Sequence, residues 1–341
     1  MTSTTSPTGT ARTYAAHARP WWQRVLLTRE AGIIALLVVV VVASLQYVEN
    51  FRSPLTLPYL VLDTTPILLI ALPMTLVIIT GEIDLSVASV VGLSSVTLGV
   101  LVEDGWSVPA AAGVAMLVGV VCGLLNGFLV ARVGLPSLAV TIGTLALFRG
   151  IAVGLLGTKA VTDFPDRWTD LATARLGETQ LPLVLVPIVV LAAAFVVLLH
   201  FTPFGRGVYD IGLSKDTAHF SGVGVARTKL ILFVLTGAVS AFAGVYFTLR
   251  YGSARGDNAS GLELQVVAAV LLGGVSIFGG RGALPGVLAG VLLIGVVSSA
   301  LRLESVTVNV INIIIGALLV LSVISPSVAG WFVRRRRSSR A

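Results

Sequence analysis

The chain alternates long apolar runs with short polar segments, and the length of those runs predicts helices that cross a membrane. A spanning helix needs about 20 mostly apolar residues. Ten runs approach or reach that length, namely residues 31–48, 59–80, 86–102, 108–131, 138–157, 183–201, 230–249, 264–278, 283–301 and 306–324. The eighth run is short, and the second contains Asp63, Pro66 and Pro73. The pattern therefore predicts an all-α integral membrane protein with about ten transmembrane helices.

The composition also indicates a membrane as the solvent of this chain. Hydrophobic residues make up 56% of the 341 positions and charged residues 11%, and the mean hydropathy is +0.98. Soluble domains carry about 25% charged residues. The net charge is +7, but the basic residues cluster at the chain ends and in one central loop, so nucleic-acid binding is not expected. The single cysteine, Cys122, forms no intrachain disulfide and is interpreted as a packing residue.

The polar ends of the chain set the expected domain organisation. Residues 1–30 are expected to form a cytoplasmic tail without a cleavable signal, residues 31–325 the transmembrane domain, and residues 326–341 a basic cytoplasmic tail. Ten spans place both termini on one side, and a cytoplasmic N-terminus puts 15 of the 23 Lys and Arg residues inside, as the positive-inside rule requires. Residues 158–182 then form an external loop, and residues 202–229 a cytoplasmic loop between two halves.

Two predicted spans carry glycine at every fourth position. The fourth span contains Gly119, Gly123 and Gly127, and we assign Gly282, Gly286 and Gly290 to the ninth. This spacing places small residues on one helix face, where helices approach closely in lipid. Each of these spans is the third of four consecutive spans, so spans 2–5 and 7–10 are interpreted as a possible inverted repeat.

The sequence offers little material for catalysis. It contains no phosphate-binding Gly-x-x-x-x-Gly-Lys-Ser/Thr loop, no metal-binding His or Cys motif and no nucleophile elbow, so we expect no enzyme activity and no metal site. Ionisable residues inside the spans are few, and Asp63 and Arg149 come closest to the membrane interior. That scarcity favours a transporter that a partner powers. A secondary carrier coupled to an ion gradient stays open as the alternative.

Residues 80–89 contain two carboxylates between the second and third spans. Glu82 and Asp84 have the spacing of a possible catalytic pair. Asp84 and Ser86 also have the chemistry of helix N-caps, because their side-chain oxygens accept hydrogen bonds from free backbone N–H groups. We favour capping over catalysis.

The loop at residues 202–229 has the pattern of a docking element. Between Lys215 and Phe220 it predicts a short helix that ends at Gly222. A short helix with polar and apolar faces outside the membrane favours contact with a soluble partner over an ordinary connection.

Three segments together resemble a known family. They are GEIDLSVAS at residues 81–89, NASGLEL at 258–264 and VLLGGVSIFGGRG at 270–282. These segments, with the cytoplasmic loop, resemble the permeases of bacterial carbohydrate ABC importers, which include ribose, xylose and galactose systems. The second and third segments are most similar to the rhamnose and autoinducer-2 branches. The resemblance covers residues 55–325, with Ala88 in place of the usual Gly, and Thr217 and His219 where Ala and Arg are commoner.

The resemblance implies the function, the location and the partners. It implies the membrane-spanning subunit of an importer for a sugar or sugar-like solute, in a bacterial cell membrane. It also implies a homodimer or a pair with a related permease, two cytoplasmic ATPase subunits that bind ATP and Mg, and an external solute-binding protein. This chain itself would hold no cofactor, and its apolar surface would contact membrane lipid.

The resemblance and the polar positions together give three sets of candidate residues. The family motif corresponds to Gly81, Asp84, Leu85 and Ser86. The ATPase-coupling segment corresponds to Gly205, Arg206, Tyr209, Gly212, Lys215, Asp216, Ala218, His219 and Gly222. Polar groups within spans are candidates for the solute pathway, and these are Asn126, Thr141, Thr144, Asn309 and Asn312. Hydrogen bonds between helices explain the last set equally well.

Overall fold

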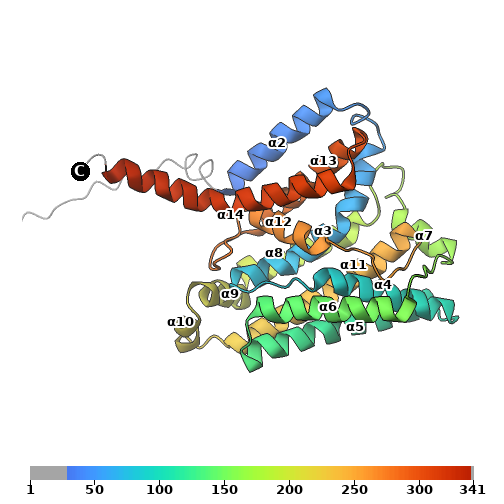
Figure 1. The fold of residues 1–341 in the computed structure, drawn as a ribbon, viewed down its shortest axis with the longest axis horizontal. Helices are drawn as coiled ribbons and strands as arrows, with labels where there is room; N and C mark the ends of the chain where they lie inside the picture. Colours follow the sequence, from blue (N-terminus) through green and yellow to red (C-terminus); the bar gives the residue numbers. More distant parts are fainter. Residues whose placement is uncertain (1–28, 339–341) are drawn as a thin grey trace, which may run out of the picture.

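The computed structural model describes residues 29–338 of the chain, and this part is built from helices (Figure 1). Residues 1–28 of the predicted N-terminal tail lie outside the described residues. In chain order the helices are α2 (Arg29–Tyr47), α3 (Thr56–Ile79), α4 (Val87–Glu103), α5 (Val108–Phe128), η1 (Leu129–Val133), α6 (Ser137–Leu156), α7 (Asp166–Thr173), α8 (Leu185–Phe201), α9 (Pro203–Leu213), α10 (Lys215–Phe220), α11 (Val225–Tyr251), α12 (Leu262–Leu272), α13 (Leu284–Leu303) and α14 (Val308–Ser338).

Each predicted span coincides with a helix, although the helices differ in length. Among the described residues, five have the length and hydropathy to cross a membrane, and α8 with α9 makes a sixth if this pair, bent by 67°, is one span. The other four predicted spans correspond to shorter apolar helices. The eighth, predicted at 264–278, ends at Leu272 because Gly273 and Gly274 follow. Its 11 residues rise about 16 Å, roughly half of a hydrocarbon core.

Helix α3 lies at the centre of the bundle. Apart from Asp63 near its start, it is apolar on all sides, and a helix of this kind requires packing partners around its whole circumference. Those partners are α8, α11, α12 and α13. Its C-terminal half from Leu69 to Ile79 is fully buried, although Pro73 lies within it. The most central helix is therefore the second predicted span, whose sequence contains one carboxylate and two prolines.

The helix pairs follow the pattern that an inverted repeat requires. Helix α4 packs against α5 and α6, and α12 packs against α13 and α14. Helix α11 packs against α4 and α5, while its counterpart α3 packs against α12 and α13. Helices α3 and α11 run antiparallel. Asp63, near the start of α3, contacts Arg250 at the end of α11, and Glu82, just after the end of α3, contacts Lys229 near the start of α11. These pairings support the predicted repeat.

The glycine pattern that suggested the repeat is only partly matched in the structure. Gly119, Gly123 and Gly127 of α5 all face α11, as predicted for close helix packing. Gly290 of α13 faces α12, so the two glycine faces do not occupy equivalent interfaces. The assignment of Gly282 to the ninth span is wrong, because this residue precedes α13 and has φ +155°.

The crossing of α5 and α11 leaves no room for side chains at the glycines. A Cβ atom on Gly119 would lie 2.6 Å from the carbonyl oxygen of Gly237, and a Cβ on Gly237 would lie 2.9 Å from the Cα of Gly123. Contact between backbones is the usual basis of helix association in lipid, where hydrophobic burial adds little.

Replacement of Gly123 by Val is therefore expected to separate α5 from α11 and to destabilise the protein by about 1–3 kcal/mol. Gly113→Val is the matched control in the same helix, because a Cβ there has no neighbour within 4 Å. The measurement is the melting temperature of the two purified variants in detergent. Equal melting temperatures would contradict the packing described here.

Candidate functional site

The loop predicted at residues 202–229 contains two helices at one end of the bundle. Helix α8 ends at Phe201, and the chain turns by 67° into α9. Helix α10 spans Lys215–Phe220 and is followed by Gly222 at φ +83°, as predicted. Helix α9 was not predicted, although Thr202 before Pro203 is a recognisable start signal. The Thr202 hydroxyl accepts a hydrogen bond from the Gly205 N–H at 3.2 Å.

Helix α9 lies against both halves of the chain. A Cβ atom on Gly212 would collide with the carbonyl oxygen of Ile79, at the end of α3, and with the amide of Gly280. These two groups are themselves joined, since the Gly280 N–H donates to the Ile79 carbonyl at 2.8 Å. The Tyr209 hydroxyl donates to the Gly282 carbonyl at 2.7 Å. Two predicted coupling residues, Tyr209 and Gly212, therefore contact the structures that join α3 to α4 and α12 to α13.

A buried ion cluster connects α10 to the same region. Glu82 is 6% exposed, and its Oε1 atom accepts hydrogen bonds from Lys215 Nζ at 3.0 Å and from Lys229 Nζ at 2.5 Å. Burial alone would raise the pKa of Glu82, but the hydrogen bonds from Lys229, Ser137 and Lys215 outweigh it, and the pKa lies below its usual range. The carboxylate is ionised at neutral pH and binds one lysine from α10 and one from α11.

The remaining predicted coupling residues divide into buried and exposed sets. Gly205 and Ala218 are buried, and a Cβ on Gly205 would collide with backbone atoms at the end of α8. Arg206, Asp216 and His219 are exposed to solvent. The coupling role of the whole set stays a prediction.

Large apolar side chains are exposed at this end of the molecule. Leu213 is 69% exposed, Phe220 89% and Phe278 87%. Leu213, at the end of α9, lies over Gly280, which is two residues after Phe278 in the chain. All three residues lie outside the five single helices of spanning length. We call these three residues the apolar patch. Such a patch marks a contact with another molecule when it lies outside the lipid.

The motif residues Asp84 and Ser86 form a buried network that was not predicted. Asp84 is 2% exposed and accepts hydrogen bonds from the Ser86 N–H at 2.9 Å and from the Ser86 hydroxyl at 2.6 Å. The Ser86 hydroxyl in turn accepts from the Asn126 side-chain amide at 2.8 Å. Burial raises the pKa of Asp84 to about 6. Gly81, at φ +79°, starts the turn, and Leu85 packs on the main core.

The N-cap interpretation of this segment is wrong in its mechanism. Ser86 does occupy the N-cap position of α4, but its side chain forms no capping hydrogen bond there. The Asp84 carboxylate binds the N–H of Ser86, two residues ahead, as in an Asx turn. Glu82 binds Lys215 and Lys229, whereas Asp84 binds Ser86, so the two carboxylates do not form a catalytic pair.

The predicted pathway residues do not line the large cavity near the start of α3. Asn126, Thr141 and Thr144 are buried. The Thr141 hydroxyl donates to the Ser137 carbonyl at 2.8 Å, and the Thr144 hydroxyl to the Thr141 carbonyl at 3.4 Å. Asn309 and Asn312 are exposed on α14. The structure therefore does not bring these five residues together, and their contact with solute stays a prediction.

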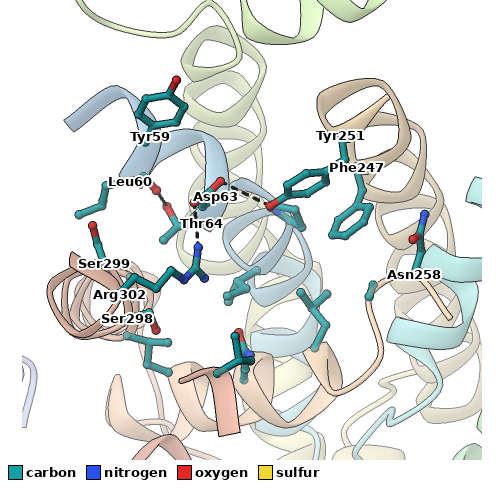
Figure 2. Close-up of a pocket in the computed structure, with 18 of the residues that line it drawn as sticks. Tyr59, Leu60, Asp63, Thr64, Phe247, Tyr251, Asn258, Ser298, Ser299 and Arg302 are labelled. Atoms are coloured by element: carbon teal, nitrogen blue, oxygen red, sulfur yellow. Dashed lines mark hydrogen bonds and ion pairs between the residues drawn. The ribbon is translucent and has the colours of Figure 1, made fainter. Parts of the chain in front are cut away.

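A large cavity opens at the opposite end of α3 (Figure 2). Its volume is about 900 Å³, within the usual range for small-molecule sites. Helices α3, α11, α12 and α13 and the segment 253–260 supply its walls. Three aromatic rings, those of Tyr59, Phe247 and Tyr251, line it beside polar side chains that include Asn258, Gln265, Ser298 and Ser299.

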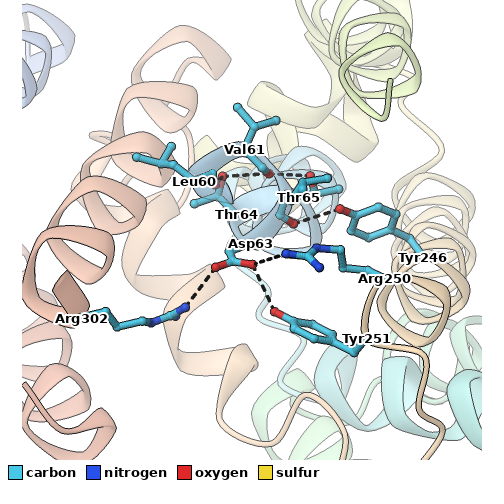
Figure 3. Close-up of polar contacts among 10 residues, drawn as sticks. Leu60, Val61, Asp63, Thr64, Thr65, Tyr246, Arg250, Tyr251 and Arg302 are labelled. Atoms are coloured by element: carbon cyan, nitrogen blue, oxygen red, sulfur yellow. Dashed lines mark hydrogen bonds and ion pairs between the residues drawn. The ribbon is translucent and has the colours of Figure 1, made fainter. Parts of the chain in front are cut away.

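Asp63 is the centre of the polar contacts in this cavity (Figure 3). Its carboxylate binds Arg302 of α13 at 3.1 Å and Arg250 of α11 at 3.5 Å, and it accepts a hydrogen bond from the Tyr251 hydroxyl at 3.4 Å. The Arg250 guanidinium also lies 5.6 Å from the Tyr59 ring centre and 5.4 Å from that of Tyr251. Three helices thus meet at one carboxylate.

Sequence reasoning recognised Asp63 but missed its two arginine partners. Arg250 and Arg302 are each in the last turn of a span, where basic residues are commonly interpreted as topology signals. Asp63 itself could have indicated these partners, because a carboxylate within an apolar helix requires a cationic partner. Arg149, the other residue singled out, donates instead to the carbonyl oxygens of Gly256, Asn258 and Ala88 at 2.7–3.1 Å.

Comparison with known proteins assigns the chain to a family. Residues 56–323 match the family described as branched-chain amino acid transport system / permease component. The chain belongs to this permease family. Proteins named autoinducer 2 import system permease protein LsrD are similar to this permease in Yersinia enterocolitica (36% identity, 79% of this chain, 85% of the relative), Salmonella typhimurium (35%, 80%, 86%) and Photorhabdus laumondii (36%, 76%, 80%). No solved structure matches it.

These matches confirm the predicted resemblance to carbohydrate-type ABC permeases and to the autoinducer-2 branch. The permease is a non-catalytic subunit of a transporter and a multi-pass protein of the inner membrane. Membership of this family implies, in general, an ATPase and a solute-binding protein as partners.

Proposed function

We propose that this permease forms the pathway of an ATP-driven importer for a sugar-like polyol, with α9 and α10 as the contact for the ATPase. The observation that carries the proposal is the position of the two sites at opposite ends of α3. The ion cluster of Glu82 follows the last turn of that helix, and the cavity around Asp63 lies near its first turns. A solute site and an energy-input site on opposite membrane sides are what an importer requires.

The apolar patch supports the ATPase contact. Phe220 is the last residue of α10 and is almost fully exposed. Exposed aromatic residues at a protein surface are frequent anchors of interfaces. The flanking Lys215 and Asp216 supply charges of both signs for a polar rim.

The replacement Phe220→Ser is expected to lower the amount of ATPase that co-purifies with the permease by about tenfold or more, because it removes an interface anchor without touching the core. The measurement is quantitative mass spectrometry of the purified complex. Trp106→Ser, at the other end of the molecule and 50% exposed, is the matched control. Unchanged ATPase recovery with the Phe220 variant would contradict the assignment.

The cavity chemistry favours a neutral polyol over an amino acid. An amino acid needs a carboxylate for its ammonium group, but both carboxylates among the described lining residues are already paired. Asp63 is bound by Arg250 and Arg302, and Asp257 by Arg255 at 2.9 Å. Hydroxyl groups can instead accept from the arginines and share the serine and amide groups, and a sugar ring can stack on an aromatic face.

Asp63→Asn is expected to reduce uptake of the solute by about tenfold or more, because a charge-assisted contact that orders the cavity is lost. The assay is uptake of radiolabelled solute into proteoliposomes with the ATPase and binding protein added. ATPase recovery should be unchanged, which separates this variant from the one at Phe220. Asp104→Asn, an exposed carboxylate outside the cavity, is the control. Wild-type uptake by the Asp63 variant would exclude the cavity from the pathway.

Orientation and partners follow from this arrangement. We place α10 and both termini in the cytoplasm and the Asp63 cavity toward the external solute-binding protein. Of the 15 basic residues assigned to the inside, nine belong to the two terminal segments, so the tails dominate the charge bias. A homodimer and a pair with a related permease both fit, and co-purification of a second permease would distinguish them.

The alternative, a carrier driven by an ion gradient, predicts uptake that survives ATP depletion. The structure buries more charge than the sequence suggested, including Glu82 and Lys229. These charges are paired at the end of α3 that faces α10, outside the cavity, which favours coupling to a partner over ion coupling at the solute.

A further inference from the structure

A second cavity lies beneath α10, at the ends of two spans. Its volume is about 740 Å³, and it lies between η1 with the following turn and the first turn of α11. The charged residues that line it are four permanent cations and one carboxylate, which gives a net charge of +3. They are Arg132, Lys215, Arg227, Lys229 and Glu82, and His219 lies beside them.

Only two of the four cations that line this cavity form an ion pair with its carboxylate. Glu82 binds the two lysines, as described above. Within the described part of the chain, neither Arg132 nor Arg227 forms an ion pair or a side-chain hydrogen bond, and both are exposed. Two guanidinium groups on the rim of a positive cavity are suited to phosphate, which they bind in a bidentate manner.

The surroundings of the cavity place it at the membrane surface. The spans Val108–Val133 and Val225–Tyr251 have their ends here. Val133, which follows Arg132 in the chain, is 53% exposed, and Leu135, which lines the same cavity, is 44% exposed. Apolar side chains next to basic ones at a span end match the two parts of a phospholipid, its acyl chains and its charged headgroup.

We propose that this cavity binds the phosphate headgroup of an anionic phospholipid between η1 and α11. Arg132 and Arg227 hold the phosphate, Val133 and Leu135 contact the acyl chains, and Lys215 brings α10 into the same site. An acidic surface of a protein partner would not need the exposed apolar residues at the membrane level. The lipid therefore supports the base of α10 from the membrane side, independently of what binds its outer face.

The test uses the purified full-length permease in nanodiscs of equal parts phosphatidylglycerol and phosphatidylcholine, with native mass spectrometry of the retained lipid. The wild type is expected to retain phosphatidylglycerol preferentially. Arg132→Gln or Arg227→Gln should each lower that preference about fivefold, and the double variant about 25-fold. Both side chains are exposed, so the fold should persist, and melting temperature in the same discs verifies this. Arg175→Gln, exposed at the other end, is the matched control.

Three outcomes would overturn the proposal. The first is an unchanged lipid preference in the double variant. The second is stabilisation of the wild type in pure phosphatidylcholine discs by inorganic phosphate to the same extent, which would assign the site to a soluble anion. The third is loss of ATPase recovery in the double variant with lipid retention unchanged, which would assign the cavity to the partner protein.

Discussion

The rest of the structure depends on the ion pairs that join the two ends of α3 to α11. The two helices run antiparallel, and an ion pair joins them at each end, Asp63 with Arg250 and Glu82 with Lys229. A buried charge without a partner costs several kcal/mol, so the buried Glu82–Lys229 pair fixes the register of the two helices strongly. The Asp63–Arg250 pair is partly exposed and contributes less. The pairs also recruit further elements, because Arg302 of α13 joins Asp63 and Lys215 of α10 joins Glu82.

This arrangement gives a physical route from the α10 end to the cavity. Asp63 lies 16 residues before Ile79, the last residue of α3, which corresponds to about 24 Å along the helix, and Glu82 lies in the turn that follows. Between them α3 is enclosed on every side, so it moves as a packed unit with its neighbours. The backbone of α9 rests on the end of α3 at Gly212, and a displacement of α9 and α10 would press directly on that end. We infer that the charge clusters are the two ends of one mechanical element.

Sequence reasoning found what depends on local pattern. The apolar runs gave the helices, and the signals around Lys215 and Gly222 gave the bounds of α10, because both depend on neighbouring residues. The pairs Glu82–Lys229 and Asp63–Arg302 join residues 147 and 239 positions apart, and no local pattern specifies such contacts. The same limit explains the pathway candidates. A polar residue within a span requires a hydrogen-bond partner, but its position in the sequence does not identify that partner. Asn126 donates to Ser86, and the polar residues of the cavity belong to other elements.

The family resemblance identified the motif residues, whereas physical reasoning from their chemistry gave the wrong role for them. Asp84 and Ser86 were recognised as motif residues, yet the capping role that their chemistry suggested is replaced by a buried network. Glycine spacing identified the interface of α5 with α11 correctly, because close approach in lipid requires it. In α13, Gly290 also lies in a close helix contact, but with α12, whereas Gly282 precedes the helix. The repeat itself is supported by helix pairing, which is a property of the three-dimensional arrangement.

The most direct test is the number of solute molecules transported per ATP hydrolysed by Lys215→Met in proteoliposomes with the ATPase and binding protein. In this variant Glu82 stays neutralised by Lys229, so the core persists while α10 loses its bond to the turn that follows α3. We expect ATPase binding and hydrolysis to continue and transport per ATP to fall about fivefold. Transport per ATP equal to that of the wild type would contradict the proposed link between α10 and α3.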